Sequence, residues 1–257
     1  MTNSESIVVK PREFSADLLL PENADELAKF MDEPLSAIAE AITGAMASGP
    51  RSWMVMGGHV VQAMLKGRLF QQVSQEIKDL RDKGKIPADF AEKKYGFKSW
   101  VELLKVIDDE APDEDRLEAL KAMFYSVNKV NLTDREQVFN YQLFQIAKRL
   151  TSGEVLLLDA VYKVYASNQW SASPGTLLLR VWATSVASQA GHGSADIVMR
   201  DQRALEKEGL ITARVGIESP DLVQEEQSVV AQNARITPLG IKFHENIKNY
   251  RTDVAQL

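Results

Sequence analysis

The chain has 257 residues, of which 45% are hydrophobic and 26% are charged, and these ordinary values exclude collagen-like, mucin-like and wholly disordered proteins. Cysteine is absent and the three histidines are far apart in sequence, which excludes thiolate metal centres and gives no support to a histidine metal site. The net charge of −6 argues against a protein that coats nucleic acid nonspecifically. No cofactor is expected.

The N-terminal residues show no secretory signal, because they lack a basic start followed by an apolar run. The longest nearly apolar run, Trp53 to Leu65, contains glycine, His59 and Gln62 and is shorter than the ~20 residues that a membrane-spanning helix requires. Together with the absence of cysteine, these features predict a cytoplasmic protein without a membrane span.

Charge is distributed unevenly along the chain. Residues 51–98 carry ten bases against five acids, a local +5, whereas residues 99–118 carry eight acids against two bases, a local −6. The favoured interpretation is that adjacent helices have complementary solvated faces that pack on each other. The alternative is a basic surface for an anionic partner.

The chain before residue 150 is expected to consist of a disordered tail at 1–11 and a helical domain at 12–149. An apolar stripe from Val61 through Val73 and Ile77 to Leu80 predicts a helix that ends near Gly84. Further helix starts are indicated by capping residues, namely Ser99 with Glu102, Pro112 with Asp113, Thr133 with Glu136, and Thr151 with Glu154.

Half of the eight methionines fall between residues 46 and 64, within a segment at 34–64 that is also rich in small side chains. Flexible thioethers fill irregular gaps in cores and also suit surfaces that adapt to partners. The core interpretation is favoured, with a partner surface as the alternative.

The order of elements after Gly153 is the most informative feature of the sequence. An apolar helix at 155–167 is followed by a helix that starts at Ser173-Pro174. A third helix, from Ala195 to Glu208, is capped by Ser194 and closed by Gly209. Two strands, 210–217 and 229–236, then enclose a polar loop, and a helix starts at Thr237-Pro238.

This order resembles a winged-helix domain, in which a two-stranded β-hairpin wing follows the third helix. The strings Leu205-Glu-Lys-Glu-Gly-Leu-Ile211 and Ile236-Thr-Pro-Leu-Gly240 are similar to a pairing in families of the MarR and PadR type. The resemblance covers residues 150–250 and does not extend to the first 150. The helical start with this ending also resembles, more distantly, the Abi-alpha group of bacterial phage-defence proteins. Winged-helix regulators commonly form dimers, so the resemblance implies a homodimer as one option for this chain.

The resemblance implies that the third helix enters the major groove of DNA. Arg200, Arg203 and Lys207 share one face of that helix, opposite Ile197 and Leu205, and are the predicted DNA contacts. Two further bases, Arg214 and Arg235, lie on the predicted wing strands and would support them. The acids of this region oppose the assignment: Asp196, Asp201, Glu206 and Glu208 on the helix, and Glu218, Asp221, Glu225 and Glu226 on the loop.

Residues 150–257 carry ten bases against twelve acids, a net charge of −2, so DNA binding would depend on a small basic patch. We therefore expect a mainly α protein, with an N-terminal helical region and a winged-helix domain at 150–257. Its function is expected to be non-enzymatic, because no catalytic motif is present. Double-stranded DNA and a protein partner remain open as ligands, the second in an adaptor that acts in phage defence.

Overall fold

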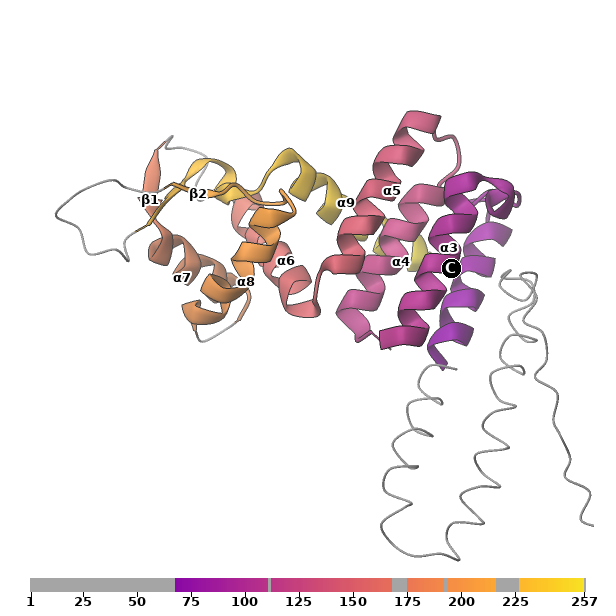
Figure 1. Ribbon diagram of the computed structural model, residues 1–257, viewed down its shortest axis with the longest axis horizontal. Coiled ribbons are helices and arrows are strands. Elements are labelled where there is room, and N and C mark those ends of the chain that lie inside the picture. The colour runs from indigo at the N-terminus through magenta and orange to yellow at the C-terminus, as the bar shows by residue number, and fades with distance from the viewer. Residues whose placement is uncertain (1–67, 111, 168–174, 192–193, 216–226, 257) are drawn as a thin grey trace, which may run out of the picture. The chain divides into compact units, whose positions relative to one another are not determined.

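The computed structural model describes residues 68–110, 112–167, 175–191, 194–215 and 227–256 (Figure 1). The tail predicted at 1–11 and the methionine-rich segment at 34–64 lie outside these ranges. The chain divides into two compact units, residues 1–78 and 79–257. In the described part of the first unit, residues 68–78 are helical, and Val73 and Ile77 are buried as the apolar stripe predicts.

The second unit begins with the end of that predicted helix. Helical residues run to Asp82, and Gly84 has a φ of +68°, so the predicted end near Gly84 is confirmed. Of the helices that the structure describes in the chain, none combines the length and the apolar character that crossing a membrane needs.

Three helices form the first part of the 79–257 unit, preceded by a short 3-10 helix: η3 (Phe90–Glu92), α3 (Lys94–Glu110), α4 (Glu114–Asn128) and α5 (Asp134–Arg149). In Figure 1, α4 lies between α3 and α5, and it packs against both. The Phe124 ring meets Trp100 and Phe90, with centroids 5.6 and 5.9 Å apart. Because α4 is enclosed in this way, nearly all of its later residues are buried.

Most of the predicted capping residues cap their helices, but one does not. The side chains of Asp113, Thr133 and Thr151 each accept a hydrogen bond from a backbone N–H in the first turn. The box predicted at Ser99 is wrong, because α3 starts five residues earlier and Ser99 is buried inside it, where its hydroxyl donates to the Gly96 carbonyl. The Glu102 carboxylate instead pairs with Lys148, at 2.8 Å.

The remaining elements are α6 (Ser152–Ala166), β1 (Thr176–Leu178), α7 (Leu179–Gln189), α8 (Ala195–Lys207), β2 (Arg214–Val215), β3 (Ser228–Val230), η4 (Gln232–Arg235) and α9 (Pro238–Val254). The strands form an antiparallel sheet in the order β1-β3-β2. The part of the unit that follows residue 150 is therefore helical with a small three-stranded sheet, which agrees with the mainly α class expected from the sequence.

The predicted bounds of the strands and of α7 need correction. The sheet contains a strand that was not predicted, β1, and α7 consequently starts at Leu179; Ser173 and Pro174 lie outside the described residues. Within the described part of the first predicted strand, residues 210–215, regular strand pairing is confined to Arg214–Val215, and Val215 is exposed. The second becomes η4 after Val230.

α6 is the central helix of this region, as its apolar sequence predicts. It packs against α4, α7, α8, η4 and α9, although Leu156 is exposed. α9 also packs on α4, where the Tyr125 hydroxyl donates to Asp253 at 2.8 Å. The domain boundary expected at 149/150 therefore falls within one compact unit, residues 79–257.

The N-terminus of α9 explains one of the glycines in the sequence strings. Thr237 caps the helix by accepting from the Gly240 N–H, at 3.0 Å. A Cβ at Gly240 would overlap the Leu210 carbonyl oxygen and lie 2.9 Å from Ile236 Cγ1. Only glycine allows the chain after α8 to pass this close to α9.

Three acids of the 99–118 run form ion pairs within this unit, Glu102 with Lys148, Glu110 with Arg116, and Glu118 with Arg251. These carboxylates therefore contribute to contacts within and between helices.

Candidate nucleic-acid interface

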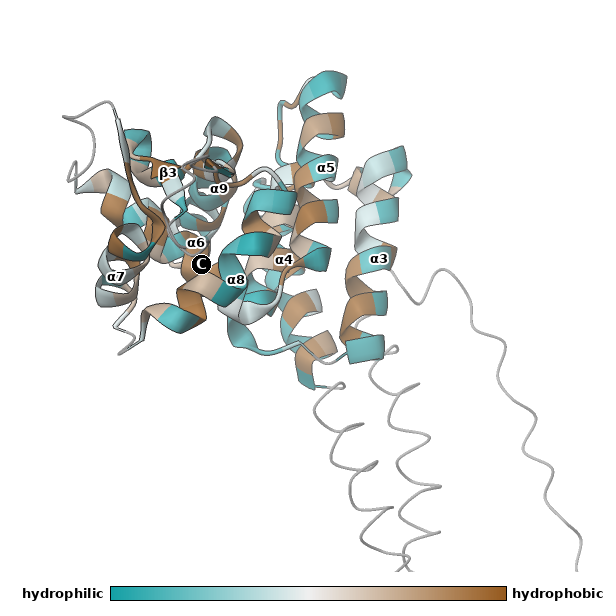
Figure 2. Cartoon of the chain, turned by 60° about the vertical axis from the view of Figure 1, so that its left-hand side comes forward, coloured by the Kyte–Doolittle hydropathy of each residue, from teal (hydrophilic) through white to brown (hydrophobic). Residues whose placement is uncertain are grey.

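The candidate interface is built on α8, whose two ends form as predicted. The Ser194 hydroxyl caps the helix by accepting from the Asp196 N–H, and Gly209 follows it with a φ of +71°. One side of α8 carries Val198 and Leu205, which are buried where the helix packs on α6 and α7. The opposite side is thereby held toward solvent, and in Figure 2 the ribbon of α8 carries both hydrophilic and hydrophobic residues, as a helix with one buried side does.

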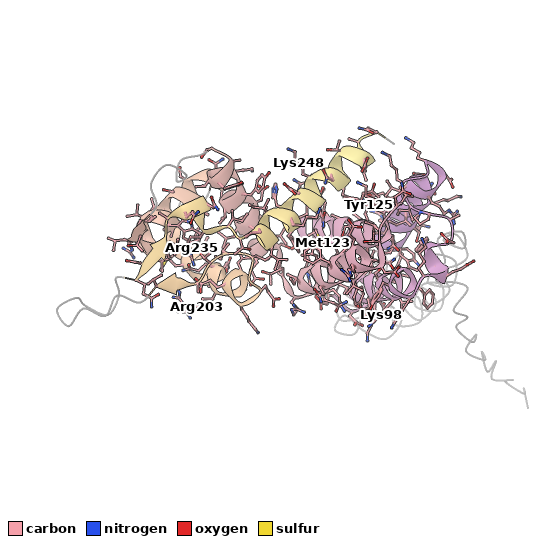
Figure 3. All side chains as sticks on the ribbon, turned by 90° about the horizontal axis from the view of Figure 1, so that it is seen from above. Lys98, Met123, Tyr125, Arg203, Arg235 and Lys248 are labelled. Carbon is pink, nitrogen blue, oxygen red and sulfur yellow. The ribbon has the colours of Figure 1, made fainter. Side chains whose placement is uncertain are left out.

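Arg200, Arg203 and Lys207 are all exposed on this outer side, as predicted. No ion pair with another described residue engages Arg203 or Lys207. Figure 3 shows Arg203 on the side of the unit away from Lys248 of α9. We call the outer side of α8, defined by Ile197, Arg200, Arg203 and Lys207, the α8 face.

Ile197 was expected to lie inward, opposite the bases, and this is wrong. Its side chain is 42% exposed, whereas the neighbouring Val198 is buried. The reason is rotational, because successive residues of a helix differ by about 100° and Val198 and Leu205 define the buried side. An apolar side chain therefore stands beside the bases of the α8 face.

Three of the four acids on and just after α8 are paired. Glu206 pairs with Arg235 at 2.5 Å, and Glu208 pairs with Arg149 of α5 at 2.5 Å. Asp201 is buried and pairs with Arg200. Three bases and four acids between residues 195 and 208 give a formal charge of −1, but Asp196, at the N-terminal end, is the one exposed acid among the four.

Arg200 and Asp201 form a two-pronged ion pair. Arg200 Nε lies 2.6 Å from Asp201 Oδ1, and Arg200 Nη2 lies 3.1 Å from Oδ2. The side chain of Arg200 is 75% exposed, whereas that of Asp201 is 8% exposed. The hydrogen bonds to Asp201 raise the pKa of Arg200, so its charge is permanent. Gly153 also lies close to Asp201, since a Cβ at this glycine would lie 3.0 Å from Asp201 Oδ2.

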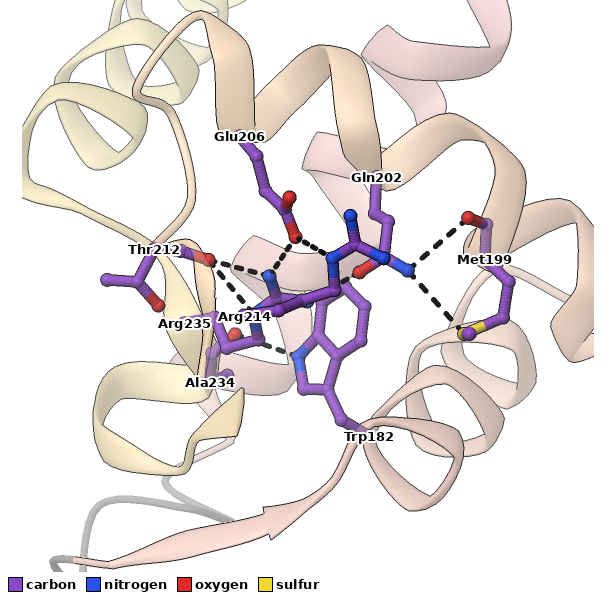
Figure 4. Close-up of polar contacts among 8 residues, drawn as sticks. All are labelled: Trp182, Met199, Gln202, Glu206, Thr212, Arg214, Ala234 and Arg235. Carbon is purple, nitrogen blue, oxygen red and sulfur yellow. Dashed lines mark hydrogen bonds and ion pairs between the residues drawn. The ribbon is translucent and has the colours of Figure 1, made fainter. Parts of the chain in front are cut away.

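Arg235 cannot contact a ligand, so its predicted supporting role is wrong. Its side chain is 0% exposed and lies over the Trp182 ring, with Cζ 4.3 Å from the centroid (Figure 4). It donates to Gln202 Oε1 at 2.7 Å, to Glu206 Oε1 at 2.5 Å and to the Thr212 carbonyl at 2.6 Å. Burial lowers the pKa of Arg235, and the pairing with Glu206 opposes this effect.

The backbone around Arg235 is also unusual. Asn233, Ala234 and Arg235 have φ values of 54°, 51° and 74°, in the left-handed region that non-glycine residues rarely adopt. The Trp182 indole N–H donates to the Ala234 carbonyl at 3.0 Å and holds this segment. The arginine is thereby turned inward, where it ties η4 to α8.

Arg214 of β2 is only partly exposed, and its Nε lies 3.4 Å from Glu206 Oε1. The loop acids from Glu218 to Glu226, as well as His59 and His192, lie outside the described residues.

The third histidine, His244, is buried in α9. It stacks on Tyr162 and pairs with Asp159 of α6 at 2.8 Å. Across the ranges that the structure describes, no three His, Cys, Asp or Glu side chains converge as metal ligands would. These contacts assign His244 to packing between α6 and α9.

Sequence patterns did not reveal Asp201 and Glu206 as the partners of the arginines. Neighbouring residues such as Arg200 and Asp201 normally point about 100° apart on a helix, and the contact of Arg235 with α8 spans some thirty residues. No local signal encodes either arrangement. No family model matches this chain, and neither a curated protein nor a solved structure matches it.

Proposed function

We propose that residues 150–257 form a winged-helix domain that binds double-stranded DNA through the α8 face. The element order supports it: α6, β1, two helices (α7 and α8) and two strands (β2 and β3), with the three strands in one antiparallel sheet. The observation that carries the proposal is the separation of charge on α8, where the bases face outward and three of the four acids pair with arginines.

The dimensions of α8 suit this role. Its 13 residues give a rod about 20 Å long, and the major groove of B-DNA, about 12 Å wide, admits one α-helix. Arg203 and Lys207 are exposed and form no ion pair with another described residue, which suits contacts to phosphate oxygens. Arg214 would support these contacts from β2. We extend the proposal to a non-enzymatic, cytoplasmic regulator that acts alone or as a homodimer.

The test measures fluorescence anisotropy of a labelled random-sequence duplex against protein concentration at several salt concentrations. If Arg203, Lys207 and Arg214 each contact one phosphate, the slope of log K against log salt is expected to be about −2.7, at about −0.9 for each contact. The Arg203→Glu/Lys207→Glu variant is expected to abolish binding. The matched control, Lys242→Glu/Lys248→Glu, makes the same charge change at exposed positions of α9 and is expected to have a much smaller effect.

Equal losses in the two variants would show that net charge, and not the α8 face, governs binding. The absence of any duplex binding by the unaltered protein would refute the proposal.

A second candidate function, binding of a protein partner, is favoured by a separate observation. Leu178 at the end of β1 and Val181 in α7 are apolar, close in sequence, and 40% and 48% exposed. Exposed apolar side chains that cluster often mark a contact surface. A Leu178→Ser/Val181→Ser variant that loses a co-purifying protein but still binds duplex would assign this surface to a partner.

A further inference from the structure

Among the bases of the α8 face, Arg200 alone has its guanidinium fixed by an ion pair with another described residue. Its Nε and Nη2 atoms both contact the Asp201 carboxylate. Asp201 is buried and therefore fixed by its surroundings, whereas Arg200 is exposed. The ion pair therefore fixes the orientation of the Arg200 guanidinium. An orientation set before binding reduces the conformational entropy that binding would otherwise remove. Arg200 therefore differs from Arg203 and Lys207 in being suited to directional recognition.

The hydrogen-bond inventory of Arg200 indicates what it recognises. A guanidinium has five N–H donors, and the contact with Asp201 occupies the edge formed by Nε and Nη2. The terminal fork of Nη1 and Nη2 remains available and exposed. In the major groove, guanine presents two adjacent acceptors, O6 and N7, that match this fork. No other base pair offers both acceptors on one base.

Ile197 adds a second, apolar element to the same surface. It precedes Arg200 by three residues, which is about 4.5 Å along the helix, close to the 3.4 Å separation of successive base pairs. Its exposure has no packing explanation, since Val198 occupies the buried position. Among the edges in the major groove, only thymine presents a methyl group for such a contact.

We propose that α8 reads a guanine through Arg200, positioned by Asp201, and an adjacent thymine methyl through Ile197. This inference rests on the proposed DNA binding and adds its base preference. Asp201 acts here as a positioning residue, because it orients Arg200 without touching DNA.

The test is selection from a duplex library with a random 12-base-pair core, followed by sequencing of the bound fraction. The unaltered protein is expected to enrich guanine at one position about 5- to 150-fold over other bases, with thymine beside it. In Asp201→Asn the guanine preference is expected to fall below twofold, while affinity for the whole library stays equal or rises because one negative charge is removed. A general structural defect would lower both.

Two variants complete the design. Asp196→Asn removes the same charge from the exposed acid of α8 and is expected to retain the guanine preference. Arg200→Lys keeps the charge but loses the planar fork, so it should bind the library within about threefold and lose the preference. Arg200→Lys therefore tests whether Arg200 reads guanine even if Asp201→Asn fails to fold.

Modified duplexes of the enriched sequence isolate each contact. Replacing the guanine by 7-deazaguanine removes N7, and replacing thymine by deoxyuridine removes only the methyl group; each is expected to weaken binding by the unaltered protein. The deoxyuridine effect should vanish in Ile197→Ala. A guanine preference that persists in both Asp201→Asn and Arg200→Lys, or binding without any preference, would overturn this inference and leave DNA binding itself intact. Failure to bind any duplex would overturn both.

Discussion

Replacing Arg235 by methionine removes a fully buried guanidinium, which lies over the Trp182 ring, and keeps an unbranched apolar side chain in its place. Three acceptors lose their donor, the Glu206 carboxylate, the Gln202 amide oxygen and the Thr212 carbonyl. Breaking one half of a buried ion pair costs about 3–5 kcal/mol, because the remaining charge loses its nearest partner inside the protein. Here Glu206 keeps only the longer contact with Arg214, at 3.4 Å. We expect the free energy of unfolding to fall by about this amount.

Urea unfolding followed by circular dichroism measures the effect. With a slope of about 3 kcal/mol per molar urea, the midpoint of Arg235→Met should fall by about 1 to 2 M. Arg251→Met is the matched control, since Arg251 also pairs with a glutamate at 2.5 Å but its side chain is 52% exposed. That change should cost under about 1 kcal/mol. Equal losses in the two variants would refute the argument that burial makes the Arg235 pair important.

A further test is whether a second change relieves the first. Arg235→Met/Glu206→Gln removes the uncompensated carboxylate, so it is expected to be more stable than Arg235→Met alone. A double variant that is less stable would show that Arg214, 3.4 Å from Glu206, already compensates that charge.

Two other predictions concern α9 and its neighbours. The hydrogen bond from His244 and the pairing with Lys163 lower the pKa of Asp159 to about 2, so its stabilising effect is complete above the usual value of 3.8 and is lost as pH falls toward 2. Asp159→Asn should therefore lower the free energy of unfolding by about 2 kcal/mol at pH 7 and by much less near pH 2. Denaturation curves at the two pH values measure this difference, and equal losses at both would contradict the prediction. Gly240→Ala should lower the melting temperature strongly, because its methyl group would overlap the Leu210 carbonyl, whereas Gly175→Ala meets no atom within 4 Å and should be nearly neutral in the same thermal scan.

The helices of this fold were predictable where their ends depend on local hydrogen bonds. Thr133, Thr151, Ser194 and Thr237 each satisfy a backbone N–H within three residues, so the information lies in a short stretch of sequence. Ser99 shows the limit of the rule, because the same spacing of serine and glutamate also occurs inside a helix.

β1 was missed because its identity depends on a distant partner. Leu177 and Leu178 continue the apolar pattern of α7, but the backbone of β1 pairs with Ser228–Val230, some fifty residues later. Nothing in the sequence of residues 176–178 alone favours a strand over a helical turn.

The candidate site was predicted in part for a similar reason. The periodicity of α8 places Arg200, Arg203 and Lys207 together and outward, as observed. The inward turn of Arg235 depends on Trp182, Gln202 and Glu206 converging from two helices, and no spacing rule represents that.

α9 has a consequence for how the 79–257 unit comes apart. It is one continuous rod of about 25 Å whose His244 contacts α6 and whose Asp253 contacts Tyr125 of α4. A rod that is shared in this way cannot leave one neighbour while it remains fully docked on the other. Amide protons of α4, α6 and α9 should therefore exchange with solvent deuterium through a common opening event, and the helices on either side of residue 150 should melt as a single cooperative block.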